Sequence, residues 1–353
     1  MSLNRFSVSQ FRCIGQAELQ LGGQDVLITG RNGAGKTSLL EAIYYLVRGR
    51  SFRQSRSERL IQHGQPNFQI FGELAAGERV HRVGIETAKG ASKIRINGRN
   101  ANNLAEINRE FVVEVIEPEI HRLISEGPEA RRRFMDYGVF HVEPSYLKAW
   151  QRYRKALKQR NAALKQNQAL APWDDALINS AAEVDTYRHG YVRLLEPAFN
   201  ETSAALGFAD IAVEYRPGWN NTLSMEEALA SSKERDRALG TTHVGPHRAE
   251  LAIKWRKRMA REQVSRGQQK LLATSFILAQ TKHLASLNNG RALLLLDDPA
   301  AELDPDSLVR VMSLVDQVDA QRIVTAIDPS DFTQNHSGAT FHVEQGEVTQ
   351  NSA

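Results

Sequence analysis

The chain has 353 residues, of which 41% are hydrophobic, and a formal net charge of +4. This length and hydrophobic content suffice for one large core and a second, smaller one, so we expect two lobes. The small net charge excludes a strongly basic, histone-like protein, and any contact with nucleic acid must therefore come from local clusters of Lys and Arg.

The N-terminal part of the chain alternates short apolar stretches with turns, a pattern typical of β-strands. One helix is expected at residues 36–47, where apolar residues recur at helical spacing directly after an apolar strand and a glycine-rich turn. The expected strands are residues 5–11, 17–21, 25–30, 68–74, 81–87, 92–98 and 110–118.

Beyond Pro118 the sequence changes to long helical segments rich in Arg, Lys, Gln, Ala and Leu, which continue to about residue 206. Residues 148–165 contain seven basic residues and no acidic one, and an apolar stripe follows the same helix. A strand at residues 209–218 and a charged helix at residues 225–240 complete this segment.

Strands and helices alternate again after Gly240. The expected strands are residues 247–255, 291–298, 322–328 and 341–348, and the expected helices are residues 267–287 and 306–318. We therefore predict an α/β fold with one lobe formed by residues 1–118 and 241–353, and a mostly helical second lobe, residues 119–240, inserted between them.

Cysteine content and apolar runs bear on the compartment. Cys13 is the only cysteine, so no disulfide can form within the chain, and a reducing compartment fits. The first 13 residues lack the apolar segment of a secretion signal. The longest aliphatic run, residues 292–296, is far shorter than the about 20 residues that cross a bilayer. We therefore expect a soluble protein of the cytoplasm, with no membrane partner.

A phosphate-binding loop is predicted where the third expected strand meets the first helix, the context that this motif requires. Glycines in such a loop let backbone N–H groups surround a phosphate, the lysine reaches the β- and γ-phosphate oxygens, and the threonine hydroxyl binds Mg²⁺. The expected nucleotide-binding residues are Gly30, Arg31, Asn32, Gly33, Ala34, Gly35, Lys36 and Thr37.

Two adjacent acids follow a run of four leucines, as in a Walker B strand. We expect Asp297 to hold Mg²⁺ and Asp298 to orient the attacking water, so that Lys36, Asp297 and Asp298 form the catalytic set, with Thr37 and Asp297 at the metal. Asp304 lies where an ABC ATPase places its D-loop aspartate.

The segment from Ser265 to Lys270 precedes an apolar helix and resembles the ABC signature motif, in which Ser265 and Gly267 would contact a γ-phosphate. The chain carries one phosphate loop and one such segment. In ABC proteins each signature segment meets the nucleotide of the opposite subunit, which implies a homodimer that ATP holds together.

Four motifs, in order, resemble those of the RecF family, in the SMC-like branch of ABC ATPases. They are residues 118–136, with Arg131-Arg132-Arg133-Phe134-Met135-Asp136, then Thr242 to Arg248, Ser265 to Lys270, and Asp297 to Asp304. The short distance from the N-terminus to the phosphate loop, with Gln10-Phe11-Arg12 before it, agrees with that branch, and the insertion of about 120 residues is far shorter than an SMC coiled coil.

The resemblance implies an ABC-type ATPase head that binds ATP and Mg²⁺ and forms a homodimer on DNA. It also implies a role in recombinational repair and the SOS response, in which the protein works with RecR and RecO to load RecA at single-stranded gaps. The DNA partners would be duplexes and junctions of single-stranded and duplex DNA.

Two departures from the wider ABC pattern predict slow hydrolysis. Asp298 is one methylene shorter than the usual glutamate, and Thr325-Ala326 stand where transporter ATPases carry a switch histidine. Since a misplacement of about 1 Å can cost on the order of a hundredfold in rate, we expect a weak, DNA-stimulated ATPase. Turnover above about 10 s⁻¹ would contradict this expectation.

Basic clusters are the candidate DNA contacts, although each one alone is more often a solvated face. In the run Arg131 to Arg133 the alternative is that at least one arginine pairs with carboxylates inside the helical lobe. A homodimer presents each cluster twice, which favours salt-sensitive tracking of phosphates. The preferred candidates are Arg131, Arg132, Arg152, Arg154, Lys155 and Lys158, and the further candidates are Arg133, Arg160, Lys254, Arg256, Lys257, Arg258 and Arg261.

Three other classes of protein stay open. A transporter ATPase subunit is disfavoured by the helical insertion and by the missing histidine. A repair nuclease of the overcoming-lysogenization type needs a metal-binding domain for which the chain has no room. A passive scaffold that binds ATP without turnover fits if Asp298 orients water poorly.

Overall fold

The computed structural model describes residues 2–54, 56–287, 292–329 and 338–350. The chain forms two compact units: Met1–Ile120 with Ile277–Ala353, and His121–Phe276. The first boundary is close to the expected one after residue 118. Residues 241–276, which we expected in the ATPase lobe, belong to the second unit, because the strand that they contribute pairs there.

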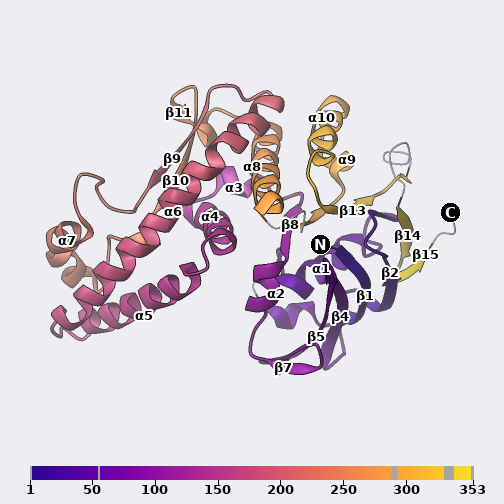
Figure 1. Ribbon diagram of the computed structural model, residues 1–353, viewed down its shortest axis with the longest axis horizontal. Coiled ribbons are helices and arrows are strands. Elements are labelled where there is room, and N and C mark those ends of the chain that lie inside the picture. Colours follow the sequence, from indigo (N-terminus) through magenta and orange to yellow (C-terminus); the bar gives the residue numbers. More distant parts are fainter. Residues whose placement is uncertain (1, 55, 288–291, 330–337, 351–353) are drawn as a thin grey trace. The chain divides into compact units, whose positions relative to one another are not determined.

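Two six-stranded sheets form the frame of the first unit (Figure 1). The antiparallel sheet has the order β2(Ile14–Gln20), β1(Ser2–Phe11), β4(Asn67–Ala76), β5(Arg79–Ala88), β6(Ala91–Ile96), β7(Arg99–Ala101). The other sheet has the order β15(Glu347–Gln350), β14(Ala339–Glu344), β3(Val26–Thr29), β13(Gln321–Ala326), β12(Ala292–Leu296), β8(Val112–Ile116), and its strands run parallel except β15.

The helix α1(Lys36–Arg48) lies in the core of this unit. Apolar residues of α1 and of both sheets form one continuous buried cluster, and most of the helix is enclosed. The helix ends at Gly49, whose left-handed conformation closes the last turn through a bond from its N–H to the Tyr45 carbonyl. The expected helix at residues 36–47 is therefore confirmed, and burial on all sides explains its apolar sequence.

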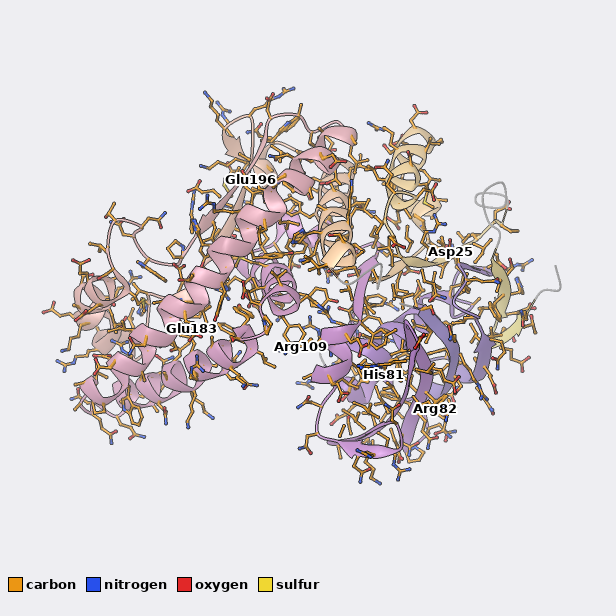
Figure 2. The ribbon with its side chains drawn as sticks, in the orientation of Figure 1. Asp25, His81, Arg82, Arg109, Glu183 and Glu196 are labelled. Carbon is orange, nitrogen blue, oxygen red and sulfur yellow. The ribbon has the colours of Figure 1, made fainter. Side chains whose placement is uncertain are left out.

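Side chains from one strand join the two sheets. The Gln321 side chain accepts a bond from the Leu3 N–H at 2.6 Å and donates to the Leu3 carbonyl at 3.2 Å. The next residue, Arg322, donates from Nε to Asp25 at 2.6 Å; Asp25, labelled in Figure 2, directly precedes β3. These bonds fix β13 against β1 and β3.

The remaining elements of the first unit are short. They are η1(Ser57–Leu60), α2(Ala105–Glu110), α9(Pro299–Glu302), α10(Pro305–Val315) and the end of α8(Arg266–Leu287), from Ile277 onward. The sequence did not predict β7 or α2, and the expected helix at residues 306–318 ends earlier, at Val315. Arg291, the first residue of one expected strand, lies outside the described residues.

Helices dominate the second unit, in which α5(Tyr146–Lys165) and α6(Ala171–Ala205) lie side by side (Figure 1). The other helices are α3(Arg122–Ser125), α4(Pro128–Val142), α7(Met225–Leu239), η2(Pro246–Arg248), η3(Ala260–Glu262) and the start of α8(Arg266–Leu287). A three-stranded antiparallel sheet, β11(Arg258–Met259), β10(Glu250–Trp255) and β9(Ile211–Arg216), completes the unit.

Three buried arginines connect these elements through carboxylates. Arg131 of α4 binds both oxygens of Glu250 on β10, and Arg188 of α6 binds both oxygens of Asp136 on α4. Arg160 of α5 donates to Asp236 on α7. Removing one partner of a buried pair leaves an uncompensated charge, so each pair specifies how its two elements dock.

Among the described residues, no helix has both the length and the apolar character needed to cross a membrane.

Candidate nucleotide site

The phosphate-loop residues and the acidic pair meet at one edge of the parallel sheet. The strands β3, β13 and β12 are neighbours in that order; Gly30 and Asp297 directly follow β3 and β12, and Thr325 is the last residue but one of β13. Ligands of open α/β sheets bind at this edge, because strand ends and helix starts converge there.

Glycine is required at the first position of the loop. Gly30 has φ 153°, and a Cβ atom built there would lie 2.3 Å from the Val343 carbonyl oxygen of β14. No side chain fits in that space, so the loop can turn beside β14 only with glycine at this position.

The start of α1 is suited to an anion. In the described structure no side chain caps this helix and no acidic residue lies in its first turn. The first backbone N–H groups therefore lack the usual partner, and the helix dipole adds positive potential. Lys36 is 4% exposed, and its Nζ donates to the Gly30 carbonyl at 2.9 Å, which curls the lysine back over the loop.

A threonine and an aspartate face one another across the site. The Thr37 hydroxyl lies 2.9 Å from each carboxylate oxygen of Asp297 and donates to one of them. Burial raises the pKa of Asp297 above its ordinary value, and bonds from Thr37 and Thr325 oppose that shift. A hydroxyl and a buried carboxylate in contact fit the protein ligands of Mg²⁺, which keeps waters and phosphate oxygens as its other ligands.

Asp298 occupies a conformation that is rare outside glycine, with φ 47°. Its Oδ2 lies 3.2 Å from Lys36 Nζ, and its N–H donates to the Thr325 hydroxyl at 2.8 Å. Its Oδ1 is buried and has no hydrogen-bond partner in the described part of the chain. An acceptor held in this way has capacity for one more donor, such as a water.

Thr325 is a site residue that the sequence did not identify. Its hydroxyl accepts the Asp298 N–H and lies 3.0 Å from Asp297 Oδ1, to which it donates its proton. In the sequence this position stands out only because transporter ATPases carry a switch histidine there. Its contacts depend on β13 lying between β3 and β12, which no local pattern reveals.

Arg12 stands beside the helix of the phosphate loop. It has φ 53°, and its Nη2 donates to Glu41 Oε1 of α1 at 2.7 Å. Because Glu41 is fully buried, this pair fixes the turn between β1 and β2 on α1.

The other predicted nucleotide contacts cap helices. The Ser265 hydroxyl accepts the Gln268 N–H at 3.3 Å, and Gln268 Oε1 accepts the Ser265 N–H at 2.9 Å, which is a reciprocal cap at the start of α8. Asp304 caps α10 by accepting the Ser307 N–H at 3.0 Å, and these bonds lower the pKa of Asp304. Contacts of Ser265, Gly267 and Asp304 with a nucleotide stay predictions.

Two of the candidate DNA contacts are occupied inside the protein. Arg131 is 2% exposed and binds Glu250 and three backbone carbonyls. The prediction of a DNA contact is therefore corrected, because its guanidinium donates its hydrogen bonds inside the protein. Arg160 is buried among Asp174, Asp236 and Thr242 and is corrected for the same reason.

The other candidates are more accessible. Arg132 is half-buried and donates to the Ala249 carbonyl at 2.7 Å. Arg152 is exposed and binds Glu183, which Figure 2 labels on α6. Arg154 lies over the Trp150 ring, and Lys155 and Lys158 are exposed.

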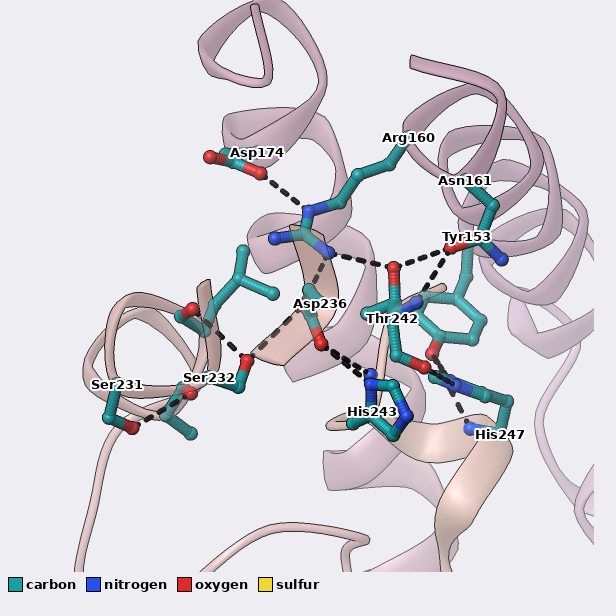
Figure 3. Close-up of polar contacts among 12 residues, drawn as sticks. Tyr153, Arg160, Asn161, Asp174, Ser231, Ser232, Asp236, Thr242, His243 and His247 are labelled. Atoms are coloured by element: carbon teal, nitrogen blue, oxygen red, sulfur yellow. Dashed lines mark hydrogen bonds and ion pairs between the residues drawn. The ribbon is translucent and has the colours of Figure 1, made fainter. Parts of the chain in front are cut away.

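The segment from Thr242 to Arg248 forms the centre of a polar cluster in the second unit (Figure 3). His247 donates from Nε2 to the Thr242 carbonyl at 3.0 Å, so its Nδ1 is the acceptor for the Tyr153 hydroxyl at 2.5 Å. Burial lowers the pKa of His247 to about 4, and the ring is neutral. This family-like motif therefore has a structural role, which joins α5 to η2.

The chain matches the family model described as the RecF/RecN/SMC N terminal domain over residues 2–350. It is 36% identical to the DNA replication and repair protein RecF of Pseudomonas paraeruginosa (strain DSM 24068 / PA7), with 99% of this chain and 98% of that protein covered. It is 37% identical to the RecF of Pseudomonas putida (strain GB-1), with the same coverage.

Solved structures give a matching result. The recombination mediator protein RecF with ATP, of the RecFOR pathway, aligns with a TM-score of 0.89 at 25% identity, over 99% of this chain and 98% of that chain. The SMC head bound to the C-terminal winged-helix domain of ScpA aligns with a TM-score of 0.59 at 17% identity, over 100% of this chain and 98% of that chain, and shows a common fold alone.

Proposed function

The chain belongs to the RecF family of DNA replication and repair proteins, and from that premise we propose that it is an ATP-dependent DNA-binding protein of recombinational repair. The observation that carries the proposal is the joint placement of Lys36, Thr37, Asp297 and Asp298 at the carboxyl edge of the parallel sheet. This is the constellation that a nucleoside triphosphate with Mg²⁺ requires.

Each residue has a part in binding. The uncapped start of α1 receives the phosphates, and Lys36 exchanges the Gly30 carbonyl and Asp298 for phosphate oxygens. Thr37 and Asp297 would hold Mg²⁺, which neutralises the charge of the phosphates when bound. Once Lys36 leaves Asp298, that carboxylate is free to orient a water.

Hydrolysis is expected to be slow. The Asp298 side chain is one methylene shorter than the glutamate usual in ABC ATPases, and Ala326, the last residue of β13, offers no imidazole. ATP would then act mainly as a switch, since a slow hydrolytic step leaves the bound state long-lived. DNA would accelerate the step by stabilising the dimer.

Each chain offers one phosphate loop and one Ser265 segment, and the two are completed by a second copy. The γ-phosphate would supply contacts across the dimer that ADP lacks, so ATP drives association by mass action. On DNA this dimer would work with RecR, and indirectly with RecO and RecA, to load RecA at single-stranded gaps in the cytoplasm.

The experiment is to measure the mass of the protein in solution without nucleotide, with ADP and with a non-hydrolysable ATP analogue, each with a short duplex. We expect a dimer that retains the duplex in the ATP-like state alone. Lys36→Met should abolish both effects, and Lys93→Met, the same change at an exposed lysine of β6, should abolish neither.

Either of two outcomes would reject the proposal. If nucleotide changes neither the mass nor the retention of DNA, a passive scaffold takes its place. If ATPase activity responds to a membrane component and not to DNA, the transporter class takes its place.

A further inference from the structure

We propose that the tip of the hairpin between β10 and β11, formed by Arg256, Lys257 and Arg258, is a phosphate-contacting element for DNA. The inference rests on the proposed function, because it names the surface of the second unit that meets the nucleic acid. It differs from the preferred sequence candidates, which lie on α4 and α5.

The backbone of this tip is strained. Trp255 pairs with Arg258, so Arg256 and Lys257 form a two-residue loop, and both have positive φ, 49° and 68°. Such loops strongly favour Asn-Gly, because a larger side chain is sterically disfavoured in the left-handed region. Two long cationic side chains stand where the fold alone would favour asparagine and glycine.

Neighbouring groups hold the strained tip in place. The Trp255 indole donates to the Ala209 carbonyl at 3.0 Å and meets the Phe208 ring edge-on at 5.7 Å between centroids. The Arg256 N–H donates to the Asp210 carbonyl at 3.2 Å. Unusual backbone that persists because its surroundings enforce it is characteristic of functional positions. A tip that is already ordered also loses little entropy when it binds.

The three cations of the tip are exposed and available. The Arg256 guanidinium lies over the Trp255 ring, 4.6 Å from its centroid. In the described part of the chain no carboxylate pairs with Arg256, Lys257 or Arg258. Two basic residues close by in the chain differ, because Lys254 pairs with Glu214 and Arg261 lies 3.7 Å from Glu262. The tip therefore carries three adjacent cations that no described carboxylate neutralises.

This chemistry suits a phosphate backbone and not a base sequence. Arg256 covers one face of the Trp255 ring, and Phe208 packs against the same ring, which disfavours base stacking there. Lys and Arg side chains at an exposed tip contact phosphates and release counterions, which makes binding salt-dependent and insensitive to sequence. The expected partner is the sugar-phosphate backbone of DNA.

The experiment replaces the tip by the residues that the turn prefers, Arg256→Asn with Lys257→Gly. Relief of the strain should raise the melting temperature, while loss of two cations should weaken binding of a fluorescent duplex by on the order of tenfold. The slope of log affinity against log salt, measured between about 50 and 200 mM with a non-hydrolysable ATP analogue, should become shallower by roughly one for each cation removed.

A matched variant separates position from net charge. Lys233→Gln with Arg237→Gln removes the same charge from exposed positions of α7 in the same unit, and it should leave affinity and slope near those of the parent. If the hairpin variant binds as the parent does, the hairpin proposal is overturned and the proposed function stands. If the parent binds no DNA in any nucleotide state, the proposed function itself fails.

Discussion

The Thr325 hydroxyl joins the two acidic residues that follow β12. It accepts the Asp298 N–H at 2.8 Å and donates to Asp297 Oδ1 at 3.0 Å, so one side chain holds both the Asp297 carboxylate and the backbone of its neighbour. Asp298 has φ 47°, a conformation that needs such support. We therefore propose that Thr325 is a positioning residue for hydrolysis.

Removing this hydroxyl without changing the side-chain volume tests its role. Thr325→Val should lower kcat for ATP by on the order of a hundredfold through misplacement of Asp298, with a much smaller change in nucleotide affinity. Thr325→Ser keeps the hydroxyl and should restore most of the rate. Steady-state kinetics and nucleotide titration measure both values; equal kcat for the valine variant and the parent would remove Thr325 from the mechanism.

The sequence identified site residues where the chemistry lies within a short motif. Residues 30–37 can be recognised from the sequence because one continuous segment supplies the groups that surround a phosphate. Thr325 could not be found in this way, since its partners come from another strand. For a related reason the sequence could not tell which arginine of residues 131–133 is paired: the partner of Arg131, Glu250, is distant in the chain, and a run of arginines looks the same whether it is solvated or paired.

The segment that contains η2 depends on one neutral histidine. His247 donates from Nε2 to the Thr242 carbonyl and accepts the Tyr153 hydroxyl at Nδ1, so a second proton would break the bond to Tyr153. Burial is the main cause that lowers the pKa of His247, and Arg248 and Arg132 lower it further. The folded protein therefore resists protonation that the unfolded chain accepts.

This difference predicts how stability depends on pH. Between pH 6.5, the ordinary value, and about 4, the unfolded state binds a proton at this histidine that the folded state does not. Its contribution to the free energy of unfolding is present above that window and is lost as pH falls through it, by at most about 3 kcal/mol. Denaturant titrations at several pH values give the free energy of unfolding of the parent and of His247→Gln. Across this window that free energy should fall more steeply with falling pH in the parent. Parallel plots of free energy against pH would show that His247 contributes nothing.

Local periodicity predicted most elements, and it failed where pairing is distant. The apolar runs of α1 and β12 are sufficient to identify them, because burial on all sides leaves continuous apolar sequence. The strand β10 was also expected, but its place in the second unit follows from pairing with β9 across the intervening α7. No pattern within β10 carries that information.

One phosphate loop and one Ser265 segment per chain make the proposed site incomplete in a single copy. In a symmetric dimer the same two surfaces meet twice, so each site takes Lys36 from one protomer and Ser265 from the other. Only the dimer would contain a complete site, because the Lys36 loop and the Ser265 segment that form it belong to different protomers. A substitution at Lys36 in one protomer and a substitution at Ser265 in the other should therefore leave one site of a mixed dimer intact.

Complementation between two inactive variants tests this arrangement. Lys36→Met and Ser265→Arg should each lose ATPase activity, but an equal mixture forms mixed dimers in which one of the two sites draws both intact residues. Each mixed dimer has one working site of two, which ATP can still hold together, so part of the parent activity, at most about half, should return. ATPase rates of each variant and of the mixture measure this, with a melting curve to show that both variants fold. If mass measurement detects mixed dimers and no activity returns, each site is not shared between protomers.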